Sequence, residues 1–270
     1  MTYLFKRHIA IPQDHGSWVF LLSPLLIGLF AGNSWKIAGI YLVIAAISVF
    51  LLRQPATILV KILSGRRSQS DLAPALFWLI LYGLVGVITV ISLIVQGFTF
   101  IALLAIPGIP VFFWHLYLVS RRSERRQIGV ELVGSGVLAL AAPAAYWVGV
   151  GSPDATGWEL FALTWLQSAA SIVYAYARLE QRVLPEWPAL PERLKLGHRA
   201  ILYTGFNFLL VTMGSIFNLL PRFLFIPYGI QLAETIWGIL NPAVGVKPTR
   251  IGLRQLIISS VFTLLFIIAW

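Results

Sequence analysis

The chain of 270 residues is 59% hydrophobic and 11% charged, with a mean hydropathy of +0.85. Soluble domains carry about 25% charged residues, so this composition excludes an ordinary soluble protein. The chain has no cysteine, which excludes disulfides, thiolate metal sites and cysteine nucleophiles. The net charge of +10 could indicate nucleic-acid binding, but the cations lie in short loops between apolar segments. That distribution argues against a nucleic-acid partner.

The N-terminus has some features of a secretory signal. Lys6, Arg7 and His8 precede an apolar run from Trp18 to Phe30. The small-residue cleavage pattern is poor, however, and a second apolar segment follows within a few residues. We therefore predict that the first apolar segment is retained as a transmembrane helix.

Nine apolar segments follow one another along the chain, most of them close to the ~20 residues that cross a hydrocarbon core. The weakest boundary is at Pro221 and Arg222, where a proline and a cation predict a tight turn. Without that turn there would be eight spans. We predict an all-α fold: one integral membrane domain, residues 1–270, forming a transmembrane bundle of about nine spans. The segments are 16–32, 37–52, 73–95, 98–119, 128–150, 158–177, 200–220, 222–240 and 252–270.

The fifth segment differs from the others in its high content of small residues. It is rich in glycine and alanine, which let neighbouring helices approach closely, and Pro143 lies within it. We predict a helix in the centre of the bundle, kinked near the proline.

Loops with many cations alternate along the chain with loops that have few. With the N-terminus in the cytoplasm, 18 of the 20 Lys and Arg residues fall on the cytoplasmic side, and only Lys36 and Arg222 fall on the other. The positive-inside rule therefore predicts a cytoplasmic N-terminus, an external C-terminus and an odd number of crossings. A bacterial cytoplasmic membrane, or a membrane of similar polarity, is the expected location, and membrane lipids are the expected partners.

Two polar stripes stand out at the ends of the second and sixth segments. Each has three residues at i, i+4 and i+8, a spacing that places them on one face of a helix. One interpretation is a pair of topology determinants that contact anionic lipid headgroups. The other is a shared site for a diphosphate or carboxylate, which arginine binds through its planar fork. The two stripes are Arg53, Thr57 and Lys61, and Tyr174, Arg178 and Arg182.

Four further polar residues are accessory candidates. Asp14 and His15 either belong to an interfacial anchor beside Trp18 or fold over the mouth of a cavity. Glu131 either pairs with Arg125 or Arg126, or is a buried polar group near a site. Glu234 lies inside an apolar segment, where an acidic residue indicates a functional role or a partner such as a loop arginine.

The sequence contains none of the familiar catalytic signatures. There is no phosphate loop, zinc motif or G-x-S-x-G sequence, and the four histidines are scattered. We predict no metal and no cofactor, and the sequence leaves open whether the protein is an enzyme.

Three short segments carry a resemblance to a known family. They read PQDHGSW at Pro12–Trp18, RQP at Arg53–Pro55 and KPTRIGLRQ at Lys247–Gln255. The chain resembles the YwiC-like family of bacterial membrane proteins, which has no settled activity.

The predicted architecture also resembles the UbiA prenyltransferase superfamily, whose members have nine helices and polar motifs after helices two and six. In that family the motifs are rich in Asn and Asp and bind Mg²⁺ diphosphate. The two stripes occupy the corresponding places here but contain no carboxylate, and Mg²⁺ prefers carboxylate or phosphate oxygens. The resemblance therefore implies a divergent protein whose cations neutralise a phosphate directly.

The sequence is compatible with three functions. The first is a UbiA-like enzyme or lipid-binding protein for an isoprenoid or another amphipathic anion. The second is a transporter of a small anionic solute, although no internal repeat is visible. The third is a non-catalytic membrane scaffold whose loops bind lipids or a soluble partner.

Overall fold

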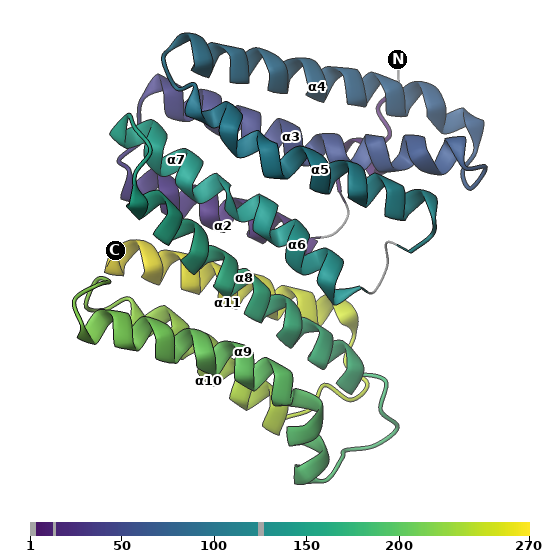
Figure 1. Ribbon diagram of the computed structural model, residues 1–270. Helices are drawn as coiled ribbons and strands as arrows, with labels where there is room; N and C mark the ends of the chain where they lie inside the picture. Colours follow the sequence, from purple (N-terminus) through teal and green to yellow (C-terminus); the bar gives the residue numbers. More distant parts are fainter. Residues whose placement is uncertain (1–3, 13–14, 124–126) are drawn as a thin grey trace.

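The computed structural model describes residues 4–12, 15–123 and 127–270, and within these ranges the chain is helical without any β-strand. The predicted all-α class is confirmed (Figure 1). The helices are α1 (Arg7–Ala10), α2 (His15–Ala31), α3 (Ile37–Leu63), the 3₁₀ helix η1 (Gln69–Asp71), α4 (Leu72–Val95), α5 (Phe100–Ser120), α6 (Ile128–Ala139), α7 (Ala141–Val150), α8 (Ala155–Gln181), α9 (Leu190–Ile216), α10 (Phe225–Leu240) and α11 (Pro248–Ala269).

Seven helical segments in the described ranges are long and apolar enough to cross a membrane, which identifies an integral membrane protein. They are α3, η1 with α4, α5, α6 with α7, α8, α9 and α11. Two other predicted spans coincide with α2 and α10, which have 17 and 16 residues. Because a hydrocarbon core needs about 20 residues, the count of nine crossings stays a prediction.

Two helix boundaries differ from the predicted ones. The seventh segment was expected to begin at residue 200, but α9 begins at Leu190. Pro191 fits the first turn of a helix, where its missing N–H costs nothing, and Gly197 packs closely on Ile239 of α10. Likewise, α3 continues through a buried Pro55 to Leu63, beyond the predicted end at residue 52, so the first polar stripe lies on the last turns of α3.

Two predicted breaks are confirmed. The chain turns at residues 217–224, between α9 and α10, where Ser215 Oγ donates to the Pro221 carbonyl at 3.0 Å. The fifth segment is divided at Leu140 into α6 and α7. Pro143 causes this break, because it has no N–H to donate to the carbonyl four residues earlier. Seven of the ten residues of α7 are buried, as expected for a central helix.

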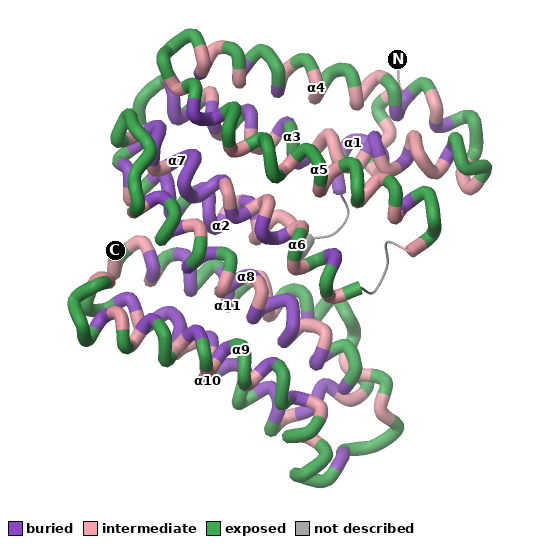
Figure 2. Tube along the Cα trace, in the orientation of Figure 1, coloured by how far each residue is buried: buried purple, intermediate pink, exposed green. Residues whose placement is uncertain are grey.

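The helices pack in an ordered sequence across the bundle (Figure 1). The pair α3 and α4 forms one edge, with α5 beside it. Next come α2 and the broken helix α6–α7, then α8 and α11, and finally α9 and α10 at the other edge. Figure 2 shows that α4 and α5 are largely exposed. Their exposed side chains include Ile80, Leu84, Ile88 and Phe113, the apolar surface that a lipid environment requires.

Successive long helices run in opposite directions, so α3, α5, α8 and α10 end where α4, α6, α9 and α11 begin. We call this the basic end of the bundle, formed by residues 4–12, 61–72, 118–123, 178–193 and 240–250. It contains most of the cations predicted to be cytoplasmic, including Lys61, Arg121, Arg182 and Lys247. Which side of the membrane it faces stays a prediction.

Candidate functional site: a polar seam between α8 and α10

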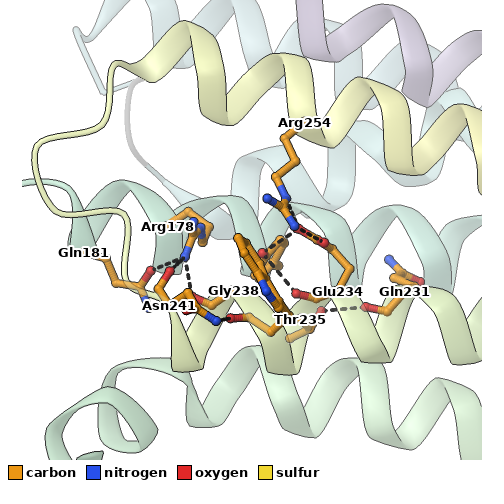
Figure 3. A network of polar contacts seen from close by, with 10 residues as sticks. Arg178, Gln181, Gln231, Glu234, Thr235, Gly238, Asn241 and Arg254 are labelled. Atoms are coloured by element: carbon orange, nitrogen blue, oxygen red, sulfur yellow. Dashed lines mark hydrogen bonds and ion pairs between the residues drawn. The ribbon is translucent and has the colours of Figure 1, made fainter. Parts of the chain in front are cut away.

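A continuous line of buried polar side chains runs along the contact between α8 and α10. Because their positions recur every three or four residues, they share one face of each helix. From Gln167 to Gln181 the line extends about 20 Å at 1.5 Å per residue. We call it the polar seam, and Figure 3 shows much of it. It comprises Gln167, Ser171, Tyr174, Arg178 and Gln181 of α8 and Gln231, Glu234 and Thr235 of α10. The backbone of Gly238 and the half-buried Asn241 extend it at the C-terminal end of α10.

Arg178 lies at the basic end of the seam and is only 7% exposed. Its Nη1 donates to Gln181 Oε1 at 2.9 Å, to the Asn241 carbonyl at 2.7 Å and to the Gly238 carbonyl. The last carbonyls of a helix lack intrahelical partners and carry the negative end of its dipole, so they attract a cation. The Nε and Nη2 atoms of Arg178 donate to no residue in the described ranges.

One turn deeper, Glu234 connects three helices. Its carboxylate accepts hydrogen bonds from Arg254 of α11 at 2.5 and 2.7 Å, and from the Tyr174 hydroxyl of α8 at 3.0 Å. The Arg254 guanidinium also lies 3.7 Å from the centre of the Trp237 ring. The predicted pairing of Glu234 with an arginine is confirmed, although Arg254 belongs to α11 rather than to a loop.

The inner end of the seam is neutral. Gln231 Nε2 donates to the Gln167 carbonyl at 3.1 Å and to Ser171 Oγ at 3.0 Å, and Gln167 Nε2 also donates to Ser171 Oγ at 3.1 Å. These residues were not predicted as site residues from the sequence, because they carry no charge. A usable signal was present, since Gln and Ser recur at helical spacing within an otherwise apolar segment.

Other cations at the basic end also bind carbonyl groups. Arg193 of α9 donates to the carbonyls of Pro188 and Leu240 at 2.7 and 2.9 Å, and Arg182 Nε donates to the Val246 carbonyl at 3.3 Å. Two arginines, Arg178 and Arg193, therefore cap α10. Gly238 lets the Tyr174 side chain of α8 approach α10 closely, because a Cβ atom there would collide with the Tyr174 hydroxyl.

The first predicted stripe lies elsewhere in the bundle. Arg53, Thr57 and Lys61 are half-buried on α3, which packs against α4, α5 and α7, whereas α8 packs against α6, α7 and α9. Both stripes are near the basic end, but α3 and α8 are not directly packed partners within the described ranges. A site shared by all six residues therefore stays a prediction. The neighbouring Gln54 donates to the His8 carbonyl at 3.0 Å.

The accessory candidates are dispersed. Asp14 and the side chain of His15 lie outside the described part of the structure. Glu131 is exposed and accepts a hydrogen bond of 2.7 Å from the Tyr176 hydroxyl, while its predicted partners Arg125 and Arg126 lie outside the described residues. Across the described ranges, no three His, Asp or Glu side chains gather as metal ligands would.

Taken as a class, this is a polytopic helical membrane protein with a buried polar seam near one edge of its bundle. The model of the family described as "YwiC-like protein" matches residues 11–146, and the chain belongs to that family. The "Uncharacterized protein YwiC" of Bacillus subtilis (strain 168) is 27% identical over 176 residues, which cover 64% of this chain and 68% of that protein. No solved structure matches the chain. The polar seam lies beyond the residues matched by the family model.

Proposed function

We propose that this protein binds the anionic headgroup of an amphipathic molecule at the basic end, through Arg178 and Arg182 with Tyr174 beside them. The observation that carries the proposal is that Arg178 is buried and has no carboxylate partner among the described residues. The nearest carboxylate in the seam, Glu234, is already held by Arg254 and Tyr174.

Two properties of Arg178 support the proposal: its charge and its hydrogen-bonding capacity. A guanidinium stays protonated in proteins, and a buried charge is costly unless it is paired. Three acceptors compensate Nη1 of Arg178, but Nε and Nη2 remain available, and together they match the two oxygens of a phosphate or carboxylate. Gln181 Nε2 is also buried, and no described residue supplies an acceptor for it. Donors therefore outnumber acceptors at this end of the seam, which favours a ligand rich in acceptor oxygens.

The apolar part of the ligand follows from the surroundings. The seam lies between α8 and α10, and α8, like the neighbouring α9 and α11, is long and apolar enough to cross a membrane. A hydrocarbon portion on the ligand would fit these surroundings. An isoprenoid diphosphate has both features. It would make this protein a divergent relative of the UbiA-like architecture, with arginines neutralising the diphosphate in place of Mg²⁺. Support for this finer proposal comes from the order of the helices and the position of the Tyr174, Arg178 and Arg182 stripe.

The test is a direct binding comparison. Purified protein in nanodiscs would be titrated with geranylgeranyl diphosphate and with geranylgeraniol, which has the same chain without the charge. We expect tighter binding of the diphosphate. Loss of one charge-assisted pair, worth about 1.5–3 kcal/mol, should weaken that binding roughly tenfold or more in Arg178→Gln, and by less in Arg178→Lys.

The matched control is Arg222→Gln, because Arg222 is exposed and lies in the turn between α9 and α10, at the opposite end of the bundle. Equal binding of the alcohol and the diphosphate would refute the proposal. So would unchanged affinity in a folded Arg178→Gln variant. Arg53→Gln and Lys61→Gln test the predicted site shared with α3. If both stripes contact the ligand, each of these substitutions should weaken binding, and its effect combined with Arg178→Gln should differ from the sum of the separate effects.

A further inference from the structure

The inner end of the polar seam contains an incomplete set of hydrogen bonds. Gln167, Ser171 and Gln231 are 3%, 7% and 5% exposed, and they lie at the contact between α8 and α10. Buried polar groups almost always have partners. Here Gln231 Oε1 has none among the described residues, so the cluster retains one unused acceptor.

The orientation of the Gln231 amide is fixed by its neighbours. Its Nε2 lies 3.1 Å from the Gln167 carbonyl oxygen, which can only accept a hydrogen bond. Rotation of the amide by half a turn would bring two acceptor oxygens together. Oε1 therefore remains the atom without a partner, and both N–H groups of Nε2 are used, on the Gln167 carbonyl and on Ser171 Oγ.

Ser171 supplies the complementary group. Its Oγ accepts from the amide nitrogens of Gln167 and Gln231, at 3.1 and 3.0 Å. With the Gln167 amide in the orientation that the structure gives it, these two bonds occupy both lone pairs of the hydroxyl and leave its proton to be donated. The cluster thus has one free donor, the Ser171 O–H, and one free acceptor, Gln231 Oε1. Because Gln231 Nε2 is only 3.0 Å from Ser171 Oγ, a single oxygen at ordinary hydrogen-bond lengths can reach both groups.

We propose that Ser171 and Gln231 form a buried binding site for a hydroxyl group, which accepts from Ser171 Oγ and donates to Gln231 Oε1. A hydroxyl is the simplest group that both donates and accepts. An anion does not fit, because it cannot donate to Oε1. A metal ion does not fit either, because Ser171 Oγ has no lone pair left to coordinate it. Gln167 Oε1 lies 3.4 Å from the Ser168 hydroxyl, whose proton is already donated to the Thr164 carbonyl at 2.9 Å, so it is a second acceptor in the same cluster.

Two sources can supply such a hydroxyl: an internal water molecule, or the hydroxyl headgroup of a neutral lipid or long-chain alcohol. The site differs from the anion site at Arg178, since it is uncharged and lies about two turns deeper along α8. It also stands on its own if no anion binds. A water would hydrate the inner seam, whereas an alcohol would insert its chain between the helices.

The test is a cryo-electron microscopy structure of the protein in phosphatidylcholine nanodiscs, with and without added geranylgeraniol, at a resolution that shows ordered water. A single round peak bridging Ser171 Oγ and Gln231 Oε1 in both samples would establish water. A peak that continues into a chain only with the added alcohol would establish the lipid hydroxyl. Either peak should disappear in Gln231→Met and persist in Ser260→Ala, which removes an exposed hydroxyl of α11.

Two results would overturn the proposal. One is a clear map of both side chains with no density between them. The other is a peak that lies about 2.4 Å from several oxygens, the geometry of a bound cation. Should Gln231→Met fail to fold, Ser171→Ala removes the donor alone, and the same loss of the peak is expected.

Discussion

Glu234 of α10 and Arg254 of α11 form a two-bond ion pair, with oxygen–nitrogen distances of 2.5 and 2.7 Å. The two partners differ in environment: the carboxylate side chain is 7% exposed, whereas the arginine side chain is 41% exposed. Tyr174 of α8 donates to the same carboxylate at 3.0 Å. One buried carboxylate therefore joins three helices, and its loss should affect their packing together.

The first prediction concerns the asymmetry of this ion pair. Arg254→Gln leaves a buried carboxylate without its cation, which costs more than leaving a partly exposed arginine alone. We expect Arg254→Gln to destabilise the protein by about 1–3 kcal/mol, a range reduced from that of fully buried pairs because Arg254 is partly solvated. The double variant with Glu234→Gln should recover part of the loss.

Thermal unfolding of the purified variants in nanodiscs would measure these differences. Arg250→Gln is the matched control, because Arg250 is exposed and lies one helical turn before Arg254 on α11. If Arg254→Gln and Arg250→Gln had equal stability, the ion pair would contribute nothing to the packing of α10 and α11.

The second prediction concerns Gly238. A Cβ atom there would overlap the Tyr174 hydroxyl, so Gly238→Ala should push Tyr174 away and disturb the Arg178 bond to the Gly238 carbonyl. Overpacking of this kind costs about 1–3 kcal/mol. Adding Tyr174→Phe removes the closest of the colliding atoms but keeps two ring carbons, at 2.8 and 2.9 Å from that Cβ, so we expect the double variant to recover part of the stability lost in Gly238→Ala.

Gly252→Ala of α11 provides the comparison. Apart from the adjacent backbone of its own helix, no described atom would lie within 4 Å of a Cβ atom at that position. An alanine at that position should be neutral or slightly stabilising. If Tyr174→Phe gave no rescue of Gly238→Ala in unfolding measurements, the collision would not be the cause of the destabilisation.

The long apolar runs made most helices predictable from the sequence. Hydrophobic length places a helix without any knowledge of its neighbours, and the breaks near Pro143 and Pro221 follow from the missing proline N–H. The start of α9 was not predictable in this way. Residues 190–199 are polar, and contacts such as Arg193 with the Leu240 carbonyl contribute to holding them against α10.

The candidate site was only half predictable. Charge identified Arg178 and Glu234, because charged residues in apolar segments are rare. The neutral residues Gln167, Ser171 and Gln231 became meaningful only when the structure showed which faces of α8 and α10 meet. The pairing of helices is decided by packing across the whole bundle, and no local pattern in one segment specifies its partner.

The third prediction concerns the N-terminal segment. Asp71 accepts from Lys6 Nζ and from Arg67 Nε, each at 2.7 Å, and thus holds residues 4–12 on the turn between α3 and α4. Asp71→Asn should weaken this attachment. If the loss is about 1 kcal/mol, trypsin should cleave after Lys6 or Arg7 several-fold faster. Mass spectrometry of timed digests would give the rates.

Asp154→Asn is the matched control for this experiment, because Asp154 caps the beginning of α8 at the opposite end of the bundle. Cleavage at the N-terminus should be unchanged in that variant. Equal rates in the Asp71→Asn and native proteins would show that other contacts hold the segment, such as the 3.0 Å bonds from Trp78 Nε1 to the Leu4 carbonyl and from the Tyr82 hydroxyl to the Ala10 carbonyl.

The fourth prediction concerns α10, which has 16 residues and is one of the two short helices on which the number of crossings depends. If α10 crosses the membrane, Asn218 and Lys247 lie on opposite sides; if it does not, they lie on the same side. The chain has no cysteine, so Asn218→Cys and Lys247→Cys each introduce a single thiol. Because 18 of the 20 Lys and Arg residues fall on one predicted side, we expect that side to be cytoplasmic.

A maleimide that cannot cross membranes should therefore label Asn218→Cys in intact cells, and should label Lys247→Cys only after the cells are opened. Ser152→Cys and Ser68→Cys calibrate the two sides, since these exposed residues lie at the ends of helices that are long enough to span. Labelling of positions 218 and 247 from one side would place α10 within a single leaflet. Glu234 would then lie near the interface, where water could weaken its ion pair with Arg254, and Arg254→Gln should cost less than predicted above.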